Sequence, residues 1–247
     1  MIHQLRVLEV NGGQVLDGPV TRFLLPAGIS GYADAQVDDY GQSANFRNRP
    51  GTILNIQARF SHPADSLLGT AGFGFWNAPY GDPSFKRLAL PQAVWFFFAS
   101  RPADLPFAPG SPGRGWFAAT IDAFTSRALI AIASAPLMLV LNQITSLRRR
   151  LWPAFRHQLG IASVPLDLDL RSWHEYRLEW QKDHCRFEVD GQTVLLTEQS
   201  PRGPLGFVCW LDNQYLVLSP RGRFRAGTLA LSEEQYMEVK ELKLATG

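Results

Sequence analysis

A β-hairpin pattern in residues 173–191 constrains the fold of this chain more than any other feature. The segment reads WHEYRLEWQKDHCRFEVDG, and bulky residues alternate with charged ones on both sides of Gln181, Lys182 and Asp183. Successive side chains of a strand point to opposite faces, so this alternation predicts two paired strands with one buried and one solvated face. Asp190-Gly191 favours a second tight turn. The pattern therefore indicates an antiparallel sheet that packs on a core.

The remainder of the chain repeats this rhythm of short strands and turns. With 247 residues, 46% of them hydrophobic, and with 21 Gly and 17 Pro, the chain suits one large all-β domain over residues 1–247. Such spacing indicates a sandwich rather than alternating strands and helices. Strands are predicted near residues 20–25, 31–38, 52–60, 70–76, 93–99, 114–120, 174–181, 184–190, 193–198, 204–211, 214–219 and 235–244.

An insertion at about 121–160 has a different pattern and is predicted to be helical. We expect Asp122 to cap its start and Pro136 to break or kink it. Its apolar run is too short to span a bilayer. Three interpretations are open: a helical hairpin packed over the sandwich, a lid over a hydrophobic cavity, or a segment (128–152) that contacts a membrane surface, with Arg148–Arg150 at headgroup level.

The hairpin motif, His-x-Tyr-x-Leu-Glu-Trp followed by Phe-x-Val-Asp-Gly, resembles the signature of the concanavalin A-like glucanases, in particular glycoside hydrolase family 16. Residues 51–60 (GTILNIQARF), 72–77 (GFGFWN) and 237–244 (MEVKELKL) are similar to the early, aromatic and closing strands of that family. The resemblance implies a jelly-roll sandwich of two antiparallel sheets with a ligand cleft. It also implies that His174 orients a ligand in the cleft, although a hydrogen-bonded strand histidine is an equal alternative.

The strand that carries catalysis in the family is altered here. Family members have Glu-x-Asp-x-(x)-Glu after the aromatic strand, whereas residues 90–100 read LPQAVWFFFAS and contain no carboxylate. A retaining glycosidase needs two carboxyl groups about 5–5.5 Å apart. The chemistry of the family therefore cannot be carried over to this strand. The side chains facing the cleft are either Ala93, Trp95, Phe97 and Ala99 or their neighbours Val94, Phe96 and Phe98.

Carboxylates on other predicted strands are the remaining candidates for chemistry. Asp34 and Asp38 lie on one side of a strand in GYADAQVDDYG, and Asp212 follows Trp210 in GFVCWLDNQ. A carboxyl group in an apolar pocket has a raised pKa and can donate a proton. We therefore take Asp38, Asp34, Asp212 and His174 as candidate catalytic residues; for the aspartates, positions on a rim or in a turn are the alternative.

Aromatic residues on the predicted strands are the candidates for ligand binding. Aromatic faces stack on sugars, enclose apolar molecules and stabilise cations. The candidates are Trp76, Trp95, Phe97, Trp116, Tyr176 and Trp210.

These candidates favour three functions, and whether the protein is an enzyme is left open. The favoured one is binding of a hydrophobic isoprenoid-like molecule, with acid-catalysed isomerisation, hydration or cyclisation as an optional further step, because residues 90–100 lose carboxylates and gain rings. The second is a carbohydrate-binding protein or an atypical glycoside hydrolase. The third is a non-catalytic membrane-peripheral or interaction protein.

Charge and motif content exclude several other classes. A net charge of +2, with no basic run beyond Arg148–Arg150, argues against a nucleic-acid partner. The five histidines lack metal-ligand spacing and no nucleotide fingerprint occurs, so no metal or cofactor is expected. Cys185 and Cys209 are predicted to be buried free thiols. The start, MIHQLRVLEV, lacks the apolar region of a signal peptide, so a cytoplasmic location is expected, with membrane association through the insertion as an option.

Overall fold

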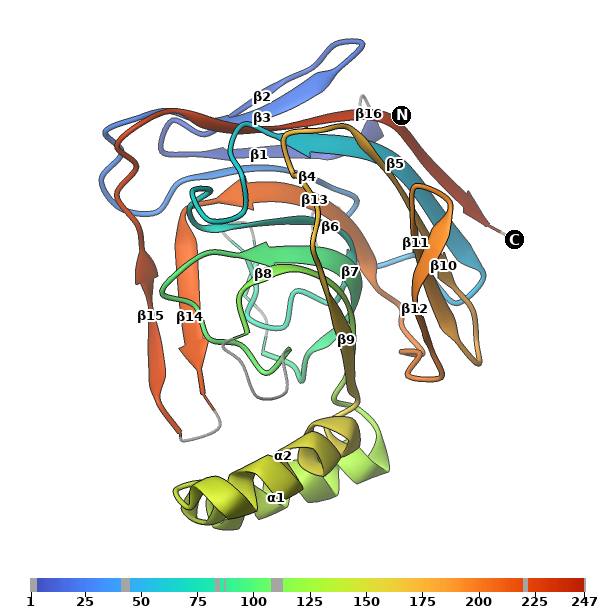
Figure 1. Ribbon diagram of the computed structural model, residues 1–247. Coiled ribbons are helices and arrows are strands. Elements are labelled where there is room, and N and C mark those ends of the chain that lie inside the picture. Colours follow the sequence, from blue (N-terminus) through green and yellow to red (C-terminus); the bar gives the residue numbers. More distant parts are fainter. Residues whose placement is uncertain are drawn as a thin grey trace.

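The computed structural model describes residues 4–40, 45–82, 85–86, 88–107, 113–219 and 222–246. Within them, two seven-stranded antiparallel sheets pack face to face, and two helices project from one end (Figure 1). This arrangement is a concanavalin A-like jelly roll. It confirms the predicted fold class, a two-sheet sandwich with an inserted helical segment.

The two sheets draw strands from all parts of the chain. Sheet A has the order β1 (Arg6–Val10), β4 (Asp34–Asp38), β13 (Gly206–Asp212), β6 (Thr70–Trp76), β7 (Gln92–Ala99), β8 (Gly115–Asp122) and β9 (Ile161–Leu166). Sheet B has the order β12 (Gln192–Thr197), β11 (Cys185–Val189), β10 (His174–Trp180), β5 (Thr52–Phe60), β16 (Gln235–Thr246), β3 (Thr21–Leu25) and β2 (Gln14–Leu16). A separate two-stranded hairpin consists of β14 (Gln214–Leu218) and β15 (Phe224–Thr228).

The predicted strands are all present, but the sequence analysis missed four short ones, β1, β2, β9 and β15. Each has a weak local signal. Strand β9 contains Pro165, which cannot donate to a sheet hydrogen bond and is tolerated because β9 is an edge strand. Strand β15 contains Gly227, and β2 has only 3 residues.

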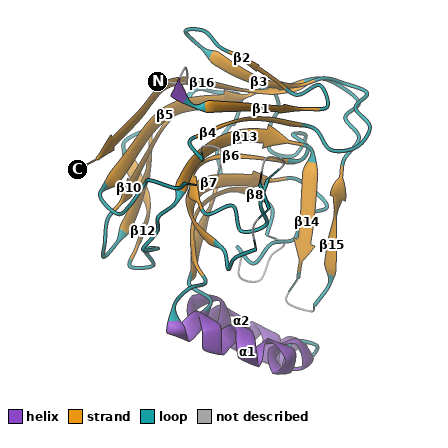
Figure 2. Cartoon of the chain, turned by 180° about the vertical axis from the view of Figure 1, so that it is seen from behind, coloured by secondary structure: helices purple, strands orange, loops and turns teal. Residues whose placement is uncertain are grey.

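The insertion forms a helical hairpin of α1 (Ser126–Leu141) and α2 (Thr145–Gln158), which Figure 2 shows projecting from the sandwich. The expectation that Asp122 caps α1 was wrong. The cap is Thr125, whose side-chain oxygen accepts from the backbone N–H of Ala128 at 3.1 Å, whereas Asp122 ends β8. Pro136 does not interrupt α1 either. Pro136 is exposed, and it has no N–H to donate to the carbonyl group four residues earlier. That carbonyl group can accept a hydrogen bond from water instead.

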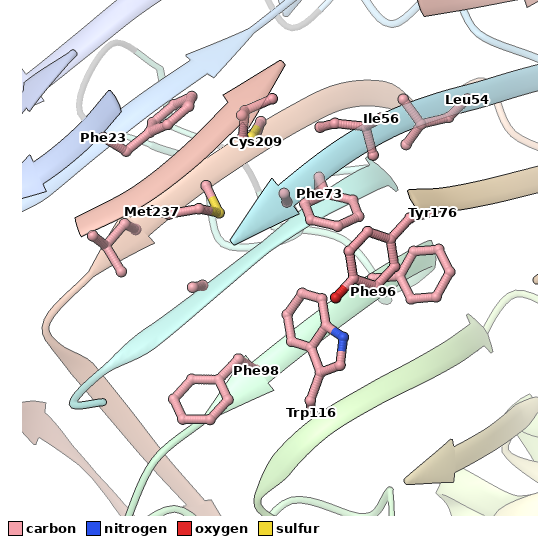
Figure 3. Packing of buried hydrophobic residues seen from close by; sticks show 14 of the residues in the cluster. Phe23, Leu54, Ile56, Phe73, Phe96, Phe98, Trp116, Tyr176, Cys209 and Met237 are labelled. Carbon is pink, nitrogen blue, oxygen red and sulfur yellow. The ribbon is translucent and has the colours of Figure 1, made fainter. Parts of the chain in front are cut away.

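The main core lies between the sheets and is rich in aromatic rings (Figure 3). The ring of Tyr176 from sheet B lies 5.0 Å from that of Phe73 and 4.9 Å from that of Phe96, both from sheet A. Edge-on packing of this kind adds to the free energy gained by burying the rings. Both cysteines are buried and free, as predicted.

Candidate functional site

The second face of sheet A, turned away from sheet B, is the place where the candidate residues gather; we call it the far face. Alternation along β7 separates the two faces. Val94, Phe96 and Phe98 belong to the core between the sheets, whereas Trp95 and Phe97 belong to a second hydrophobic cluster. The far face therefore holds one of the two sets of side chains that the sequence left open for a cleft: Ala93, Trp95, Phe97 and Ala99.

Glycines on the central strand β6 make room for rings on this face. Trp210 of β13 lies opposite Gly72 of β6, which in turn lies opposite Phe97 of β7. A Cβ atom on Gly72 would lie 2.9 Å from Cη2 of Trp210. The neighbouring Gly74 lies opposite Trp95 in the same way. The indole rings of Trp210 and Trp95 can therefore lean over two positions of β6, Gly72 and Gly74, that offer no side chain.

Four rings form one continuous group, which we call the aromatic cluster: Trp76, Trp95, Phe97 and Trp210. The Trp95 ring is central, with centroids 5.3 Å from Trp76, 5.0 Å from Phe97 and 5.5 Å from Trp210. Trp95, Phe97 and Trp210 are 6–8% exposed. Among the described residues, nothing accepts a hydrogen bond from the buried indole N–H of Trp95. Buried polar groups are nearly always satisfied, so this donor requires an explanation.

Two other predicted ligand-binding residues lie elsewhere. Trp116 and Tyr176 are in the core between the sheets, 2% and 1% exposed, and their rings lie 5.8 Å apart. Trp116 leaves sheet A on the side opposite the aromatic cluster, and Tyr176 packs against it from sheet B. For this reason neither residue is part of the candidate site.

Strand β4 forms the polar half of the far face. Asp38, a candidate catalytic residue on this strand, is completely buried, and its carboxylate has several hydrogen-bond donors. Its carboxylate accepts from Nε of Arg6 at 2.9 Å, from Gln36 at 2.7 Å and from the backbone N–H of Tyr40 at 3.0 Å. Arg6 also pairs with Asp82. With these partners, Asp38 anchors β1 to β4 and has little capacity left for a ligand.

Asp34 and Asp212 are brought together as direct partners in the register of β4 and β13, and we call them the carboxyl pair. Side chains at such positions have Cβ atoms about 4.5–5.5 Å apart. Oδ1 of Asp212 accepts from the backbone N–H and hydroxyl of Thr70 and from the backbone N–H of Gln214. Oδ2 of Asp34 accepts from the Tyr32 hydroxyl at 2.9 Å. Oδ1 of Asp34 is buried and has no hydrogen-bond partner among the described residues.

Burial separates the protonation states of the carboxyl pair. It raises the pKa of Asp34 well above the usual value, and the nearby charge of Asp212 raises it further, although the Tyr32 hydroxyl opposes this. Burial raises the pKa of Asp212 to about 6, against the lowering effect of the hydrogen bonds from Gln214 and Thr70. Burial and the charge of Asp212 therefore both favour the protonated form of Asp34, while Asp212 ionises above pH about 6.

His174, the fourth catalytic candidate, lies in sheet B and not on the far face. Its Nδ1 is 2.7 Å from Oδ2 of Asp190 and its Nε2 is 3.1 Å from the carbonyl oxygen of Asp169. Both ring nitrogens are therefore engaged in holding the ends of the 173–191 hairpin and the preceding loop. This is the hydrogen-bonded strand histidine that the sequence left as an alternative.

Sequence reasoning did not single out Arg6, Thr70 or Asp82 as members of this site. Thr70 links the two halves, because its hydroxyl accepts from the indole N–H of Trp210 at 3.0 Å and donates to Asp212 at 2.9 Å. Nothing local to Thr70 signals this role, since its partners come from another strand. Among the described residues, no group of three or more His, Cys, Asp or Glu could hold a metal ion.

No family model matches the chain, and no curated protein matches it. Solved structures that share its fold include a pseudo-β-1,3-glucanase and immunostimulatory antigen of Mycobacterium tuberculosis, 11% identical over 98% of this chain and 91% of that one, with a TM-score of 0.48. Others are the carbohydrate recognition domain of Emp47p (10% identity, 99% and 89% covered, TM-score 0.48) and an endo-β-1,4-glucuronan lyase of the fungus Trichoderma reesei (12%, 99% and 88%, 0.46). The chain also matches part of a longer protein, a sialidase, and spans 17% of its length. At these identities the likeness is one of fold alone.

Proposed function

We propose that the far face binds a saccharide. The observation that carries this proposal is the pair of buried, unpartnered polar atoms on that face among the described residues: Oδ1 of Asp34 and the indole nitrogen of Trp95. One is a hydrogen-bond acceptor or, when protonated, a donor, and the other is a donor. Sugar hydroxyls can both donate and accept, so a sugar ligand satisfies both atoms.

The surroundings favour a neutral sugar. Trp76, the one ring of the aromatic cluster that is not buried, offers an apolar surface for the C–H face of a pyranose ring. Asp212 is ionised above pH about 6 and would repel the carboxylate of a uronic acid. We therefore expect neutral oligosaccharides to bind better than polyuronates.

The positions of the two unpartnered atoms indicate an extended ligand. Asp34 and Trp95 are separated by three strand-to-strand steps and by four residues along the strand direction. Standard strand dimensions place their Cα atoms roughly 20 Å apart. A single sugar ring does not span that distance, so one ligand that contacts both residues is an oligosaccharide.

The carboxyl pair supplies the two groups that glycoside cleavage needs. Asp34, whose raised pKa favours the protonated form, is the general acid, and ionised Asp212 is the base or nucleophile. This makes the protein an atypical glycoside hydrolase, with the chemistry moved from β7 to the β4–β13 pair.

The experiment is a binding and cleavage screen with neutral and uronic-acid oligosaccharides, read by calorimetry and by release of reducing ends. We expect binding of a neutral oligosaccharide that Asp34→Asn and Trp95→Phe both weaken, and cleavage that Asp212→Asn abolishes without loss of binding. Glu175→Gln, an exposed change on sheet B, is the matched control and should have no effect. The absence of binding to any oligosaccharide would overturn the proposal. Binding without cleavage would leave only a carbohydrate-binding role.

A hydrophobic isoprenoid-like ligand is the second candidate. The observation that favours it is the size of the apolar surface, since Phe107 and Phe117 extend the aromatic cluster beyond Phe97. Protonated Asp34 would act as the acid for isomerisation, hydration or cyclisation, and the rings would stabilise a cation. A hydrocarbon cannot satisfy Oδ1 of Asp34 and the Trp95 N–H together, which is why we rank it second. Displacement of an apolar dye by isoprenoids, with no response to sugars, would reverse the ranking.

A further inference from the structure

One end of the molecule concentrates exposed apolar side chains. Half of the large hydrophobic side chains that are exposed in the described residues lie between 124 and 144, on or beside α1. Ile130 and Val140 are 70% and 67% exposed. Two more, Leu218 and Phe224, lie at the tip of the β14–β15 hairpin. We call this set the apolar end: Phe124, Leu129, Ile130, Ile132, Leu137, Leu139, Val140, Ile144, Leu218 and Phe224.

The helix and the hairpin tip form one surface. A Cβ atom on Gly222, in the turn between β14 and β15, would lie 3.3 Å from Cδ2 of Leu139 in α1. Figures 1 and 2 both show the tip of this hairpin beside the helices, at the end of the molecule remote from the two chain termini. A group of neighbouring exposed apolar side chains on a protein surface usually marks an interaction site.

Charge at this end has a single sign. Residues 123–166 contain five arginines and residues 213–230 contain three, and neither segment has an aspartate, glutamate or lysine. The whole chain has a net charge of only +2, so the rest of it is net negative. Arg149 and Arg150 are exposed, as are Arg223 and Arg225. No carboxylate of the described residues forms a salt bridge with any of these four.

The helical hairpin is held firmly enough to present this surface. Trp152 and Phe155 of α2 pack on Ala131 of α1, with ring centroids 5.6 Å apart. Arg156 ties α2 to the sandwich through hydrogen bonds to the carbonyl oxygen of Phe107 and the hydroxyl of Ser163. The inner side of the hairpin is thus used for packing, and only Ala128 and Ala131 of α1 are buried. The outer side of α1 is left for another partner.

We propose that the apolar end binds the surface of an anionic lipid bilayer, with α1 lying in the membrane plane and the arginines at the level of the phosphates. An exposed apolar helix flanked by arginines is the pattern of an interfacial helix. No helix of the described residues combines the length and the apolar character needed to cross a bilayer. A second copy of the chain fits less well, because a two-fold contact would bring the same arginines against each other.

The test is flotation of the full chain with vesicles of phosphatidylcholine alone and of equal parts phosphatidylcholine and phosphatidylglycerol. We expect binding only to the anionic vesicles, weakened by salt. Ile130→Glu with Val140→Glu should abolish binding, and Arg149→Glu with Arg150→Glu should weaken it by at least roughly thirty-fold. Leu196→Glu, at an exposed apolar position on sheet B, is the control and should bind like the wild type.

Because the substituted side chains are exposed, the variants should keep the thermal midpoint and circular dichroism of the wild type. Three results would overturn the proposal: no flotation with anionic vesicles at low salt, unchanged flotation of the Ile130→Glu, Val140→Glu variant, or a wild-type dimer in light scattering that this variant converts to monomer. The last result would assign the apolar end to self-association.

Discussion

Sheet A presents two aromatic faces that look alike in sequence and differ in chemistry. On its core face, Phe96 and Trp116 pack against Tyr176 of sheet B within a hydrophobic cluster. On its far face, Trp95 and Phe97 lie on the same strand as Phe96 but share their surface with Asp34 and Asp212. One residue of displacement along β7 therefore separates a place in the core between the sheets from a place on the face proposed to bind a ligand. Which face of the sheet a ring lies on, and not its residue type, makes this difference.

The largest expected difference is in the free energy of unfolding lost when each of two consecutive phenylalanines is replaced. Phe96→Ala removes a fully buried ring between two sheets and should lower the free energy of unfolding by about 3–5 kcal/mol. Phe97→Ala removes a ring at 8% exposure and should cost about 2 kcal/mol. Urea unfolding of the two variants measures both. Equal losses would mean that the far face is simply a second core.

The second contrast concerns the aspartates of β4. Asp38→Asn deprives Arg6 of its buried partner and should cost about 3 kcal/mol of unfolding free energy. Asp34→Asn removes a buried carboxyl group whose pKa is raised well above the usual value, so it removes the free-energy cost of burying that group at neutral pH and should not lower stability. Thermal unfolding at neutral pH compares the two, and a larger loss for Asp34→Asn would contradict the assignment of Asp38 as the structural member.

The third prediction uses pH. The pKa of Asp212 is about 6 in the folded chain and about 4 for an unfolded aspartate, so the unfolded chain releases this proton first. The stability that Asp212 contributes is therefore complete below pH 4 and is lost as pH rises through 6, by on the order of 2 kcal/mol. Urea titrations across this range should show a steeper decline in the wild type than in Asp212→Asn, which keeps only the decline that the raised pKa of Asp34 causes. A parallel decline in the variant would refute this origin.

The smallest effect tests a single hydrogen bond. Trp95→Phe keeps an aromatic ring but replaces the indole by a smaller ring without the N–H, so affinity for a neutral oligosaccharide should fall at least roughly five- to tenfold, the effect of one lost hydrogen bond. Trp173→Phe alters an indole that instead lies under the side chains of Arg59 and Lys240. Calorimetry should show unchanged affinity in that control.

Much of the fold could be predicted from the sequence because its signals are local. The alternation in residues 173–191 determines which side chains of β10 and β11 face inward, and the turn at Asp190-Gly191 has the positive φ angles of 51° and 75° that this dipeptide favours. The boundaries of the helical insertion were also predicted closely. Its cap was not, because Thr125 and Asp122 are both good capping residues and only the end of β8 decides between them.

The site was less predictable because its parts come from distant segments. The partnership of Asp34 with Asp212 depends on the pairing of β4 with β13, which no local pattern reveals. Trp76 and Trp116 both lie on aromatic strands, but one lies in the aromatic cluster and the other in the core. The register with β7 decides this, because Trp76 pairs with Ala93 of the far face and Trp116 pairs with Phe98 of the core.

The central claim is that a saccharide contacts the far face and not the core. The most direct measurement is the set of indole N–H resonances of the seven tryptophans in isotope-labelled protein, followed during titration with a neutral oligosaccharide. We expect the resonances of Trp76, Trp95 and Trp210 to shift, while those of Trp116, Trp152, Trp173 and Trp180 stay in place. The Trp95 resonance is assigned by its loss in Trp95→Phe. Shifts confined to the second group, or no shift at saturating sugar, would contradict the central claim.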